Sequence, residues 1–498
     1  MNKQPLRQRV ARNSLIVAAG DWALRLISVV SMVILARILS PSDFGLAAAA
    51  AAVVVFLKAL TSVGQVQYLV QKTDLEQADL DTAWTAKLLY SLVATGLMLG
   101  FAHQISGFFN EPRLTHVLYV LAWIPCLDAL RSIGLAVQRR ELNFGVTTKL
   151  DITAKLISFV VTVAAAFILQ DYWALVIGEI ASALALMVGS HVYARHKVSL
   201  SLSRYGLQWH FVKWMYIQGV FNLIREKVDT LLVTRYLGVA TGGHYAMSIR
   251  LGDLAVNNFM RPLGATLYSG FAKVKNDPRA LRASALEAAT IMLFIITPIF
   301  VWVSMAAHPL VLLVLGEKWT DIVPIIPIVT AMFCMMQFIG LLNTVLIITG
   351  KFKASTAASA ISIILFVTAI LAMAPDIHLE RFATARALTI GLSALLMVMI
   401  VMGHMGIGLP LLIRSLWKPV VAGILSALAV LGMLTALPAL QSHALLELCA
   451  TGTVVLITYL VPFYLWRALT GNSGQELDFI HKLLIPIAKS FYAKRKAP

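Results

Sequence analysis

Charged residues are scarce in this sequence, and acidic residues are the scarcer kind. Of the 498 residues 13% are charged, with 24 Asp and Glu against 41 Lys and Arg. Apolar segments of about 20 or more residues recur along the chain, which is the length that an α-helix needs to cross a bilayer. A soluble protein of this size does not repeat such segments, so the sequence predicts a polytopic membrane protein.

The apolar segments also lack the alternation of apolar and polar residues that a transmembrane β-barrel requires. Lipid offers the backbone no hydrogen-bond partners, so helices are the remaining way to span it. We therefore predict an all-α fold with about fourteen transmembrane helices. They include predicted helices over residues 44–70, 114–138 and 284–314.

Cysteines and long polar loops are few as well. Cys126, Cys334 and Cys449 lie in apolar segments, so neither a disulfide framework nor a metal-ligand spacing is predicted. No Ser/His/Asp, zinc-binding or paired-carboxylate arrangement appears, nor an external loop that could house glycosyl-transfer chemistry. The chain is therefore predicted not to be an enzyme and to use no cofactor.

Basic residues are spread over short connections and the two ends of the chain. Under the predicted helix count, about 25 Lys and Arg lie on the side of the N-terminus and about 5 on the other side. Both termini are thus expected to be cytoplasmic, and nucleic acid is not an expected partner. The basic tail is expected either to lie on anionic lipid as an amphipathic helix or to be solvated.

An internal repeat divides the chain. The sequence RILSPSDFG at 37–45 is echoed by RYLGVATGG at 235–243, and weaker echoes keep an offset of about 200 residues. An even number of predicted helices separates the copies, so they should share one orientation, as in transporters with parallel repeats. We predict an N-terminal lobe at 1–200 and a C-terminal lobe at 201–410, each of about six helices. About two further helices at 411–468 and a cytoplasmic tail at 469–498 complete the chain.

Polar residues at helical spacing mark the predicted helices with which each lobe begins. Each charge at the centre of a membrane helix costs about 2.5–3.5 kcal/mol, so these residues should face a protein interior or a water-filled cavity. In the second lobe they fall on one face of each of two helices. Those residues are Asn222, Arg225, Asp229, Arg250, Asp253, Asn257 and Arg261. The first lobe contributes Asp21, Arg25 and Lys58.

We predict from these stripes a substrate site near the middle of the membrane. Cations outnumber acids there, which favours an anionic ligand, and Arg suits bidentate binding of phosphate. The predicted substrate-binding residues are Arg25, Lys58, Arg225, Arg250, Asn257 and Arg261. The predicted orienting or ion-coupling residues are Asp21, Asn222, Asp229 and Asp253. The alternative for each acid–base pair is that its members neutralise one another locally. Glu179 is a further candidate proton carrier, with a satisfied structural acid as the alternative.

Four segments resemble signatures of one transporter family. They are ARILSPSDFGL at 36–46, QRRELNF at 138–144, LGEKW at 315–319 followed by Ile325, and Asn222 with Asp229 ahead of Leu237. Through them the chain resembles the Wzx-type polysaccharide flippases, especially the colanic-acid-exporter branch. This family belongs to the multidrug/oligosaccharidyl-lipid/polysaccharide exporter superfamily.

The resemblance implies a V-shaped fold and a location in the bacterial inner membrane. It also implies that undecaprenyl-diphosphate-linked oligosaccharide repeat units move to the outer leaflet, for exopolysaccharide, capsule or lipopolysaccharide biosynthesis. Exchange against protons or sodium, and contact with membrane lipid and with other polysaccharide assembly proteins, are further implied.

Three other functions stay open. A drug or cation antiporter of the same superfamily should present acids and aromatic rings to an organic cation, and the surplus of cations argues against it. A membrane polysaccharide polymerase or ligase should carry external catalytic residues in a long loop. A passive scaffold for a polysaccharide assembly complex should move no substrate by itself.

Overall fold

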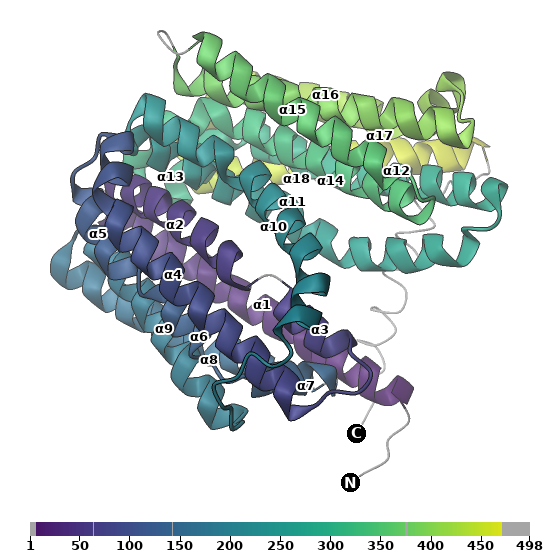
Figure 1. The fold of residues 1–498 in the computed structure, drawn as a ribbon. Coiled ribbons are helices and arrows are strands. Elements are labelled where there is room, and N and C mark those ends of the chain that lie inside the picture. The colour runs from purple at the N-terminus through teal and green to yellow at the C-terminus, as the bar shows by residue number, and fades with distance from the viewer. Residues whose placement is uncertain (1–5, 63, 142, 374–376, 471–498) are drawn as a thin grey trace, which may run out of the picture. The chain divides into compact units, whose positions relative to one another are not determined.

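Every secondary-structure element in the described part of the chain is a helix, as predicted (Figure 1). The structure is a computed structural model that describes residues 6–62, 64–141, 143–373 and 377–470. The chain forms two compact units, Met1–Ala246 and Met247–Pro498. The first unit holds α1 (Leu6–Ile38), α2 (Pro41–Ser62), α3 (Gln65–Gln71), α4 (Gln77–Phe109), α5 (Arg113–Leu121), α6 (Ile124–Ala129), α7 (Gly134–Arg140), α8 (Phe144–Leu169), α9 (Trp173–Tyr193), α10 (Tyr205–Leu237) and the start of α11 (Val239–Val274).

Many of these helices have the length and composition of membrane spans. Within the described residues 11 helices are long and apolar enough to cross a membrane. The number rises to 12 if the bent pair Arg113–Ala129 and Gly134–Arg140 forms one span. Helices α10 and α11 are 33 and 36 residues long but are not among these candidates, because they carry the polar stripes. The chain is thus a multi-pass membrane protein. The candidate spans in its described residues are fewer than the transmembrane helices predicted from the sequence, which number about fourteen.

The first unit is a bundle in which α8 pairs with α9 and α1 packs on α8. Gly178 of α9 lies so close to α8 that a Cβ atom there would come within 1.8 Å of the Thr162 hydroxyl oxygen. Small residues let membrane helices approach closely in this way. Helix α2 packs against α4 and α10, and the buried Leu46, Leu114 and Leu118 belong to the apolar core around α2, α4 and α5.

The two echoed segments meet at the start of α2 and the start of α11. A Cβ atom on Gly45 would lie 1.7 Å from the carbonyl oxygen of Val239, and one on Gly243 would lie 1.9 Å from that of Pro41. Val239 follows Pro41 by the same number of residues as Gly243 follows Gly45. The contact is therefore reciprocal, as it is across a two-fold axis, and it supports the internal repeat.

The segment between α9 and α10 is held along the first turns of α4. Asp81 accepts hydrogen bonds from the backbone N–H of Ser199 at 3.1 Å and from its hydroxyl at 2.6 Å. The backbone N–H of Arg204 donates to the Thr82 hydroxyl at 3.2 Å, and the side-chain amide of Gln77 donates to a backbone carbonyl of the segment. The predicted lobe boundary at residue 200 falls in this segment, which belongs to the first unit together with α10.

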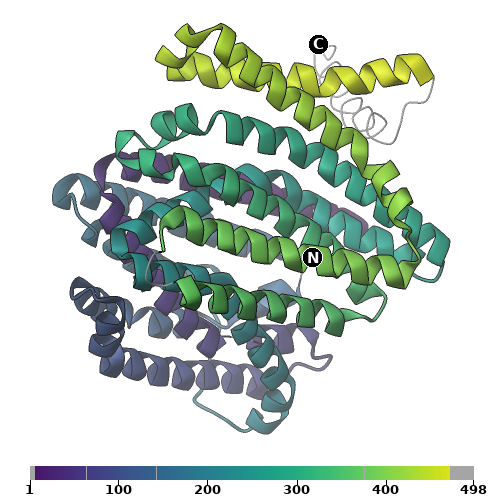
Figure 2. The ribbon, with the colours of Figure 1, turned by 90° about the horizontal axis from the view of Figure 1, so that it is seen from above.

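The second unit contains the rest of α11 and a layered set of helices (Figure 2). They are α12 (Pro278–Met305), α13 (Ala307–Val314), the 3-10 helix η1 (Glu317–Ile325), α14 (Ile326–Ile348), α15 (Phe352–Met373), α16 (Leu379–Met405), α17 (Leu409–Ala436), the 3-10 helix η3 (Pro438–Ser442) and α18 (Ala444–Thr470). Helices α17 and α18, yellow in Figure 2, lie side by side and pack on α12. The Tyr459 hydroxyl of α18 donates to the carbonyl of Phe294 at 3.0 Å, which ties this pair to α12.

Three of the predicted helices, over 44–70, 114–138 and 284–314, are interrupted in the structure. The 44–70 helix ends at Ser62 because Gly64 adopts a φ of 95°, a left-handed conformation that other residues avoid. The 114–138 helix is three short helices, α5, α6 and α7, and the 284–314 helix divides between α12 and α13. Of the predicted tail, residues 471–498 lie outside the described residues.

Candidate functional site

Three charged side chains meet inside the first unit. Lys87 of α4 forms an ion pair with Asp128 of α6, with 2.8 Å between Nζ and Oδ2. Arg131, just after α6, holds the other carboxylate oxygen at 2.7 Å. Lys87 also donates to the backbone carbonyl of Asp128 at 2.7 Å. About a fifth of each side chain is exposed. Both oxygens of this carboxylate are therefore occupied by cations.

This cluster lies at a break in a candidate membrane span. Helix α6 ends at Ala129, α7 begins at Gly134, and the pair is bent by 54°. The backbone N–H of Ser132 donates to the Ser190 hydroxyl of α9 at 2.8 Å, and the Ser132 hydroxyl donates to the Ala194 carbonyl. Irregular backbone at membrane depth is tolerated where it is buried in protein or lines a water-filled cavity. The two hydrogen bonds of Ser132, to Ser190 of α9 and to Ala194 at the end of α9, hold the irregular backbone against protein on one side of the break.

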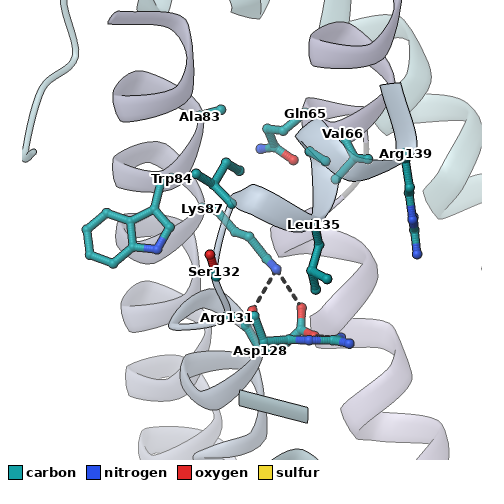
Figure 3. Close-up of a pocket in the computed structure, with 12 residues that line it drawn as sticks. Gln65, Val66, Ala83, Trp84, Lys87, Asp128, Arg131, Ser132, Leu135 and Arg139 are labelled. Carbon is teal, nitrogen blue, oxygen red and sulfur yellow. Dashed lines mark hydrogen bonds and ion pairs between the residues drawn. The ribbon is translucent and has the colours of Figure 1, made fainter. Parts of the chain in front are cut away.

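A cavity of about 200 Å³ lies on the other side of this cluster (Figure 3). Its polar lining comes from α3, α4, α6, α7 and the segment between α6 and α7, and most of its apolar lining comes from α3, α4 and α7. The polar residues are Gln65, Lys87, Asp128, Arg131, Ser132 and Arg139. Figure 3 shows Lys87 reaching toward Asp128 while the ring of Trp84 turns away from it.

Lys58, one of the predicted substrate-binding residues, lies close to this cluster. It lines a second cavity, of about 60 Å³, together with Asp128, Arg131 and Glu179 of α9. Asp128 and Arg131 line both cavities. The two cavities together present the cations Lys58, Lys87, Arg131 and Arg139 against the acids Asp128 and Glu179, so their lining carries a surplus of positive charge.

The two predicted residues of α1 are arranged differently. The Arg25 guanidinium lies over the ring of Trp22, 5.5 Å from its centroid, a cation–π contact within one helix. Asp21 is exposed and Arg25 is half-buried. Neither residue lines the two cavities described above.

Asp229 of α10 is buried against the first turns of α11. It accepts a hydrogen bond from the Tyr245 hydroxyl at 3.2 Å and one from the backbone N–H of Thr230 at 2.9 Å. With 7% of its surface exposed, Asp229 helps to fix the α10–α11 pair.

In the second unit, Asp253 and Asn257 of α11 are linked to α14. The side-chain amide of Asn257 donates to the Asp253 carboxylate, and Gln337 of α14 donates to the Asn257 oxygen. The predicted i,i+4 stripe thus forms a hydrogen-bonded chain, with a third member from another helix. Arg250 of α11 is exposed. The side chains of the remaining predicted residues, Asn222, Arg225 and Arg261, lie outside the described residues.

Comparison with known proteins decides the family. Residues 34–324, more than half of the chain, match a family described as polysaccharide biosynthesis proteins. The chain belongs to this family. The lipopolysaccharide biosynthesis protein WzxC of Escherichia coli (strain K12) is 21% identical over 349 residues, 69% of this chain and 71% of WzxC. The succinoglycan biosynthesis transport protein ExoT of Rhizobium meliloti (strain 1021) is 25% identical over 324 residues, 64% of this chain and 65% of ExoT.

Solved structures show the fold of this Wzx-like family member. The lipid II flippase MurJ, in an inward closed conformation, matches with a TM-score of 0.74 at 13% identity, over 91% of this chain and 99% of MurJ. A MATE-family multidrug resistance transporter of the MOP superfamily, facing inward, matches with a TM-score of 0.60 at 11% identity, over 77% of this chain and 94% of the transporter. The predicted membership in the Wzx-like family is confirmed, and with it the prediction of a transporter rather than an enzyme.

Two of the segments through which the sequence resembles the Wzx-like family, 36–46 and 138–144, hold helix ends in place. Asp43 caps the start of α2, since its carboxylate accepts from the backbone N–H of Ser40 at 2.9 Å and from the Ser40 hydroxyl at 2.6 Å. Arg140 donates to the backbone carbonyls of Leu69, Lys72 and Thr73 at the end of α3. Such contacts hold helix ends that lack intrahelical partners. They explain why these segments identify a Wzx-like fold and do not identify its cargo.

Sequence reasoning missed the Lys87–Asp128–Arg131 cluster. A signal was present, because Asp128 and Arg131 stand at i,i+3 and Lys87 interrupts an otherwise apolar helix. The cluster was not predicted because residues 114–138 were expected to form one helix, and a continuous helix gives no structural reason for charges at its centre. In this Wzx-like chain the arrangement can hold an anionic or hydroxyl-bearing group in a partly polar cavity beside a bent span.

Proposed function

We propose that this transporter moves undecaprenyl-diphosphate-linked oligosaccharide repeat units from the inner to the outer leaflet of the bacterial inner membrane, by alternating access. Such transport would serve exopolysaccharide, capsule or lipopolysaccharide biosynthesis. The family and the printed roles of WzxC and ExoT support a polysaccharide cargo. The resemblance to MurJ, a lipid II flippase, supports a lipid-linked one.

The observation that carries the proposal is the surplus of cations in the two cavities of the first unit. Lys58, Lys87, Arg131 and Arg139 face the acids Asp128 and Glu179. Buried charges at membrane depth mark substrate or ion pathways, and a diphosphate requires cationic partners. A drug or cation antiporter would need the opposite balance of charge.

The substrate-binding and orienting residues predicted from the sequence are part of this proposal. Arg25, Lys58, Arg225, Arg250, Asn257 and Arg261 would hold the diphosphate or an acidic sugar. Asp21, Asn222, Asp229 and Asp253 would orient them, and one of these acids would carry a coupling proton or sodium ion. We further propose that α10 and α11 span the membrane, which gives about fourteen spans in lobes at 1–200 and 201–410, with both termini cytoplasmic.

A transport assay tests this function. Purified protein in liposomes should move a fluorescent undecaprenyl-diphosphate-linked oligosaccharide between leaflets, and protein-free liposomes should not. Lys58→Met and Arg225→Ala should abolish movement while leaving membrane insertion intact. Lys149→Met, which removes an exposed lysine of α8, is the matched control and should move substrate normally. Absence of movement by the wild-type protein would refute the proposal, as would normal movement by both variants.

A further inference from the structure

Two residues that line the larger cavity of the first unit each carry a buried polar atom without a hydrogen-bond partner among the described residues. The side-chain oxygen Oε1 of Gln65 and the Nε of Arg131 have no hydrogen-bond partner among the described residues. Gln65 is 5% exposed, and both residues line the cavity of about 200 Å³. Nearly all buried polar groups in proteins are hydrogen-bonded, so an unpartnered atom on a cavity-lining residue marks a place where a ligand or a water molecule can bind.

The missing partners have opposite characters. Oε1 of Gln65 accepts hydrogen bonds, so it needs a donor, whereas Nε of Arg131 donates and needs an acceptor. Asp128 does not supply the acceptor at Nε, because Arg131 reaches its carboxylate through Nη1 and Nε has no partner among the described residues. A ligand for this cavity must therefore donate at one point and accept at another.

This requirement distinguishes the sugar part of a lipid-linked glycan from its diphosphate as a ligand for the cavity. A fully ionised diphosphate carries acceptors and no donor, so it would leave Gln65 unsatisfied. A sugar hydroxyl both donates and accepts. The size also fits, since about 200 Å³ corresponds to roughly six waters of liquid volume, which is comparable to one sugar ring. Val66, Leu135 and Ala136 supply apolar surface for the ring.

We propose that this cavity binds one hydroxyl-bearing sugar of the cargo glycan. Gln65 accepts a hydrogen bond from a sugar hydroxyl, and the Nε of Arg131 donates to a sugar oxygen. The exposed Arg139 at the edge of the cavity favours sugars that carry an acid. The inference rests on the proposed function and adds to it that this cavity recognises the glycan, with the diphosphate bound outside the cavity, at cations such as Lys58.

Saturation-transfer NMR on the purified full-length protein in detergent tests this site. The probes are methyl glucoside, methyl galactoside and methyl glucuronide. We expect saturation transfer to at least one glycoside with the wild-type protein and at least a tenfold weaker signal with Gln65→Leu. Gln67→Leu is the matched control, because Gln67 is exposed on the same short helix, and it should retain the signal. Sodium pyrophosphate at equal concentration should not displace the sugar.

The melting temperature of each variant shows whether a lost signal reports lost binding or unfolding. Gln65→Leu removes an unpartnered acceptor, so it should melt at or above the wild-type temperature, and a lost signal then reports binding rather than unfolding. No saturation transfer in the wild-type protein, an equal signal in Gln65→Leu, or displacement by pyrophosphate would each overturn the sugar site. These outcomes are independent of the leaflet assay: Gln65-dependent sugar binding without transport refutes the proposed function alone, and transport without sugar binding refutes the sugar site alone.

Discussion

Asp128 should contribute more to the stability of the first unit than Lys87 does. Its carboxylate holds Lys87 at 2.8 Å and Arg131 at 2.7 Å, and 21% of its side chain is exposed. Asp128→Asn therefore leaves two cations without their counter-charge, whereas Lys87→Met leaves the pair of Asp128 and Arg131 intact. Removing one partner of a buried ion pair costs about 3–5 kcal/mol.

We expect Asp128→Asn to lower the free energy of unfolding by about 3 kcal/mol, since the amide oxygen can still accept one hydrogen bond. Lys87→Met should lower it by about 1 kcal/mol or less, because the loss of the ion pair is offset by the burial of an apolar side chain in place of a charge. In the double variant, Lys87→Met should recover about 1 kcal/mol or more of the loss caused by Asp128→Asn.

Denaturant titration of the purified protein in detergent, followed by tryptophan fluorescence, measures these differences. Lys149→Met also removes one lysine, from the exposed face of α8, and should stay within about 0.5 kcal/mol of wild type. Strictly additive losses in the double variant would contradict the reasoning, as would a loss for Lys87→Met as large as that for Asp128→Asn. Either result would mean that the Lys87 and Asp128 charges do not compensate each other.

Three further predictions concern other parts of the first unit. Gly45→Leu should destabilise the protein by about 3 kcal/mol or more, measured by the same titration, because even a Cβ atom would lie 1.7 Å from the Val239 carbonyl oxygen. Asp81→Asn should cost about 1.5–3 kcal/mol, and its effect should appear as faster proteolysis of the segment before α10, to which Asp81 is hydrogen-bonded. The Arg113 guanidinium lowers the pKa of Glu111 below its ordinary value of 4.5, so this pair should stabilise the protein above that pH and cease to do so as the pH falls. A melting temperature that declines from pH 6 to pH 3 equally in wild type and Glu111→Gln would contradict the assignment.

The helical class and most spans could be predicted from the sequence because both depend on local composition. An apolar segment of sufficient length needs a helix in lipid whatever surrounds it. The breaks could not be predicted in this way. The end of α2 depends on Gly64 at a φ of 95°, and the end of α3 depends on Arg140, which follows far along the chain and donates to its last carbonyls. Both are properties of the folded unit rather than of one segment.

The same distinction applies to the candidate site: contacts within one helix could be predicted, and contacts between distant helices could not. The spacing of Asp253 and Asn257 predicted that they share a helix face, and they are hydrogen-bonded. Their third partner, Gln337, comes from α14, and no periodicity within α11 could identify it. Lys87 and Asp128 are likewise separated by 41 residues. Charges that are satisfied by a distant helix can be recognised from the sequence as unusual, but their partners cannot be assigned.

Affinity for the lipid carrier and selectivity for the glycan can reside in different residues of this protein. Lys87 and Arg131 are committed to Asp128, whereas Lys58 brings a further cation to the smaller of the two cavities. A diphosphate needs cations, and we propose Lys58 for that role, whereas a sugar needs the donor and acceptor that Arg131 and Gln65 offer. Substitutions at Lys58 should therefore reduce transport of every diphosphate-linked cargo. Substitutions at Gln65 should change which glycan is carried, without changing the carrier lipid.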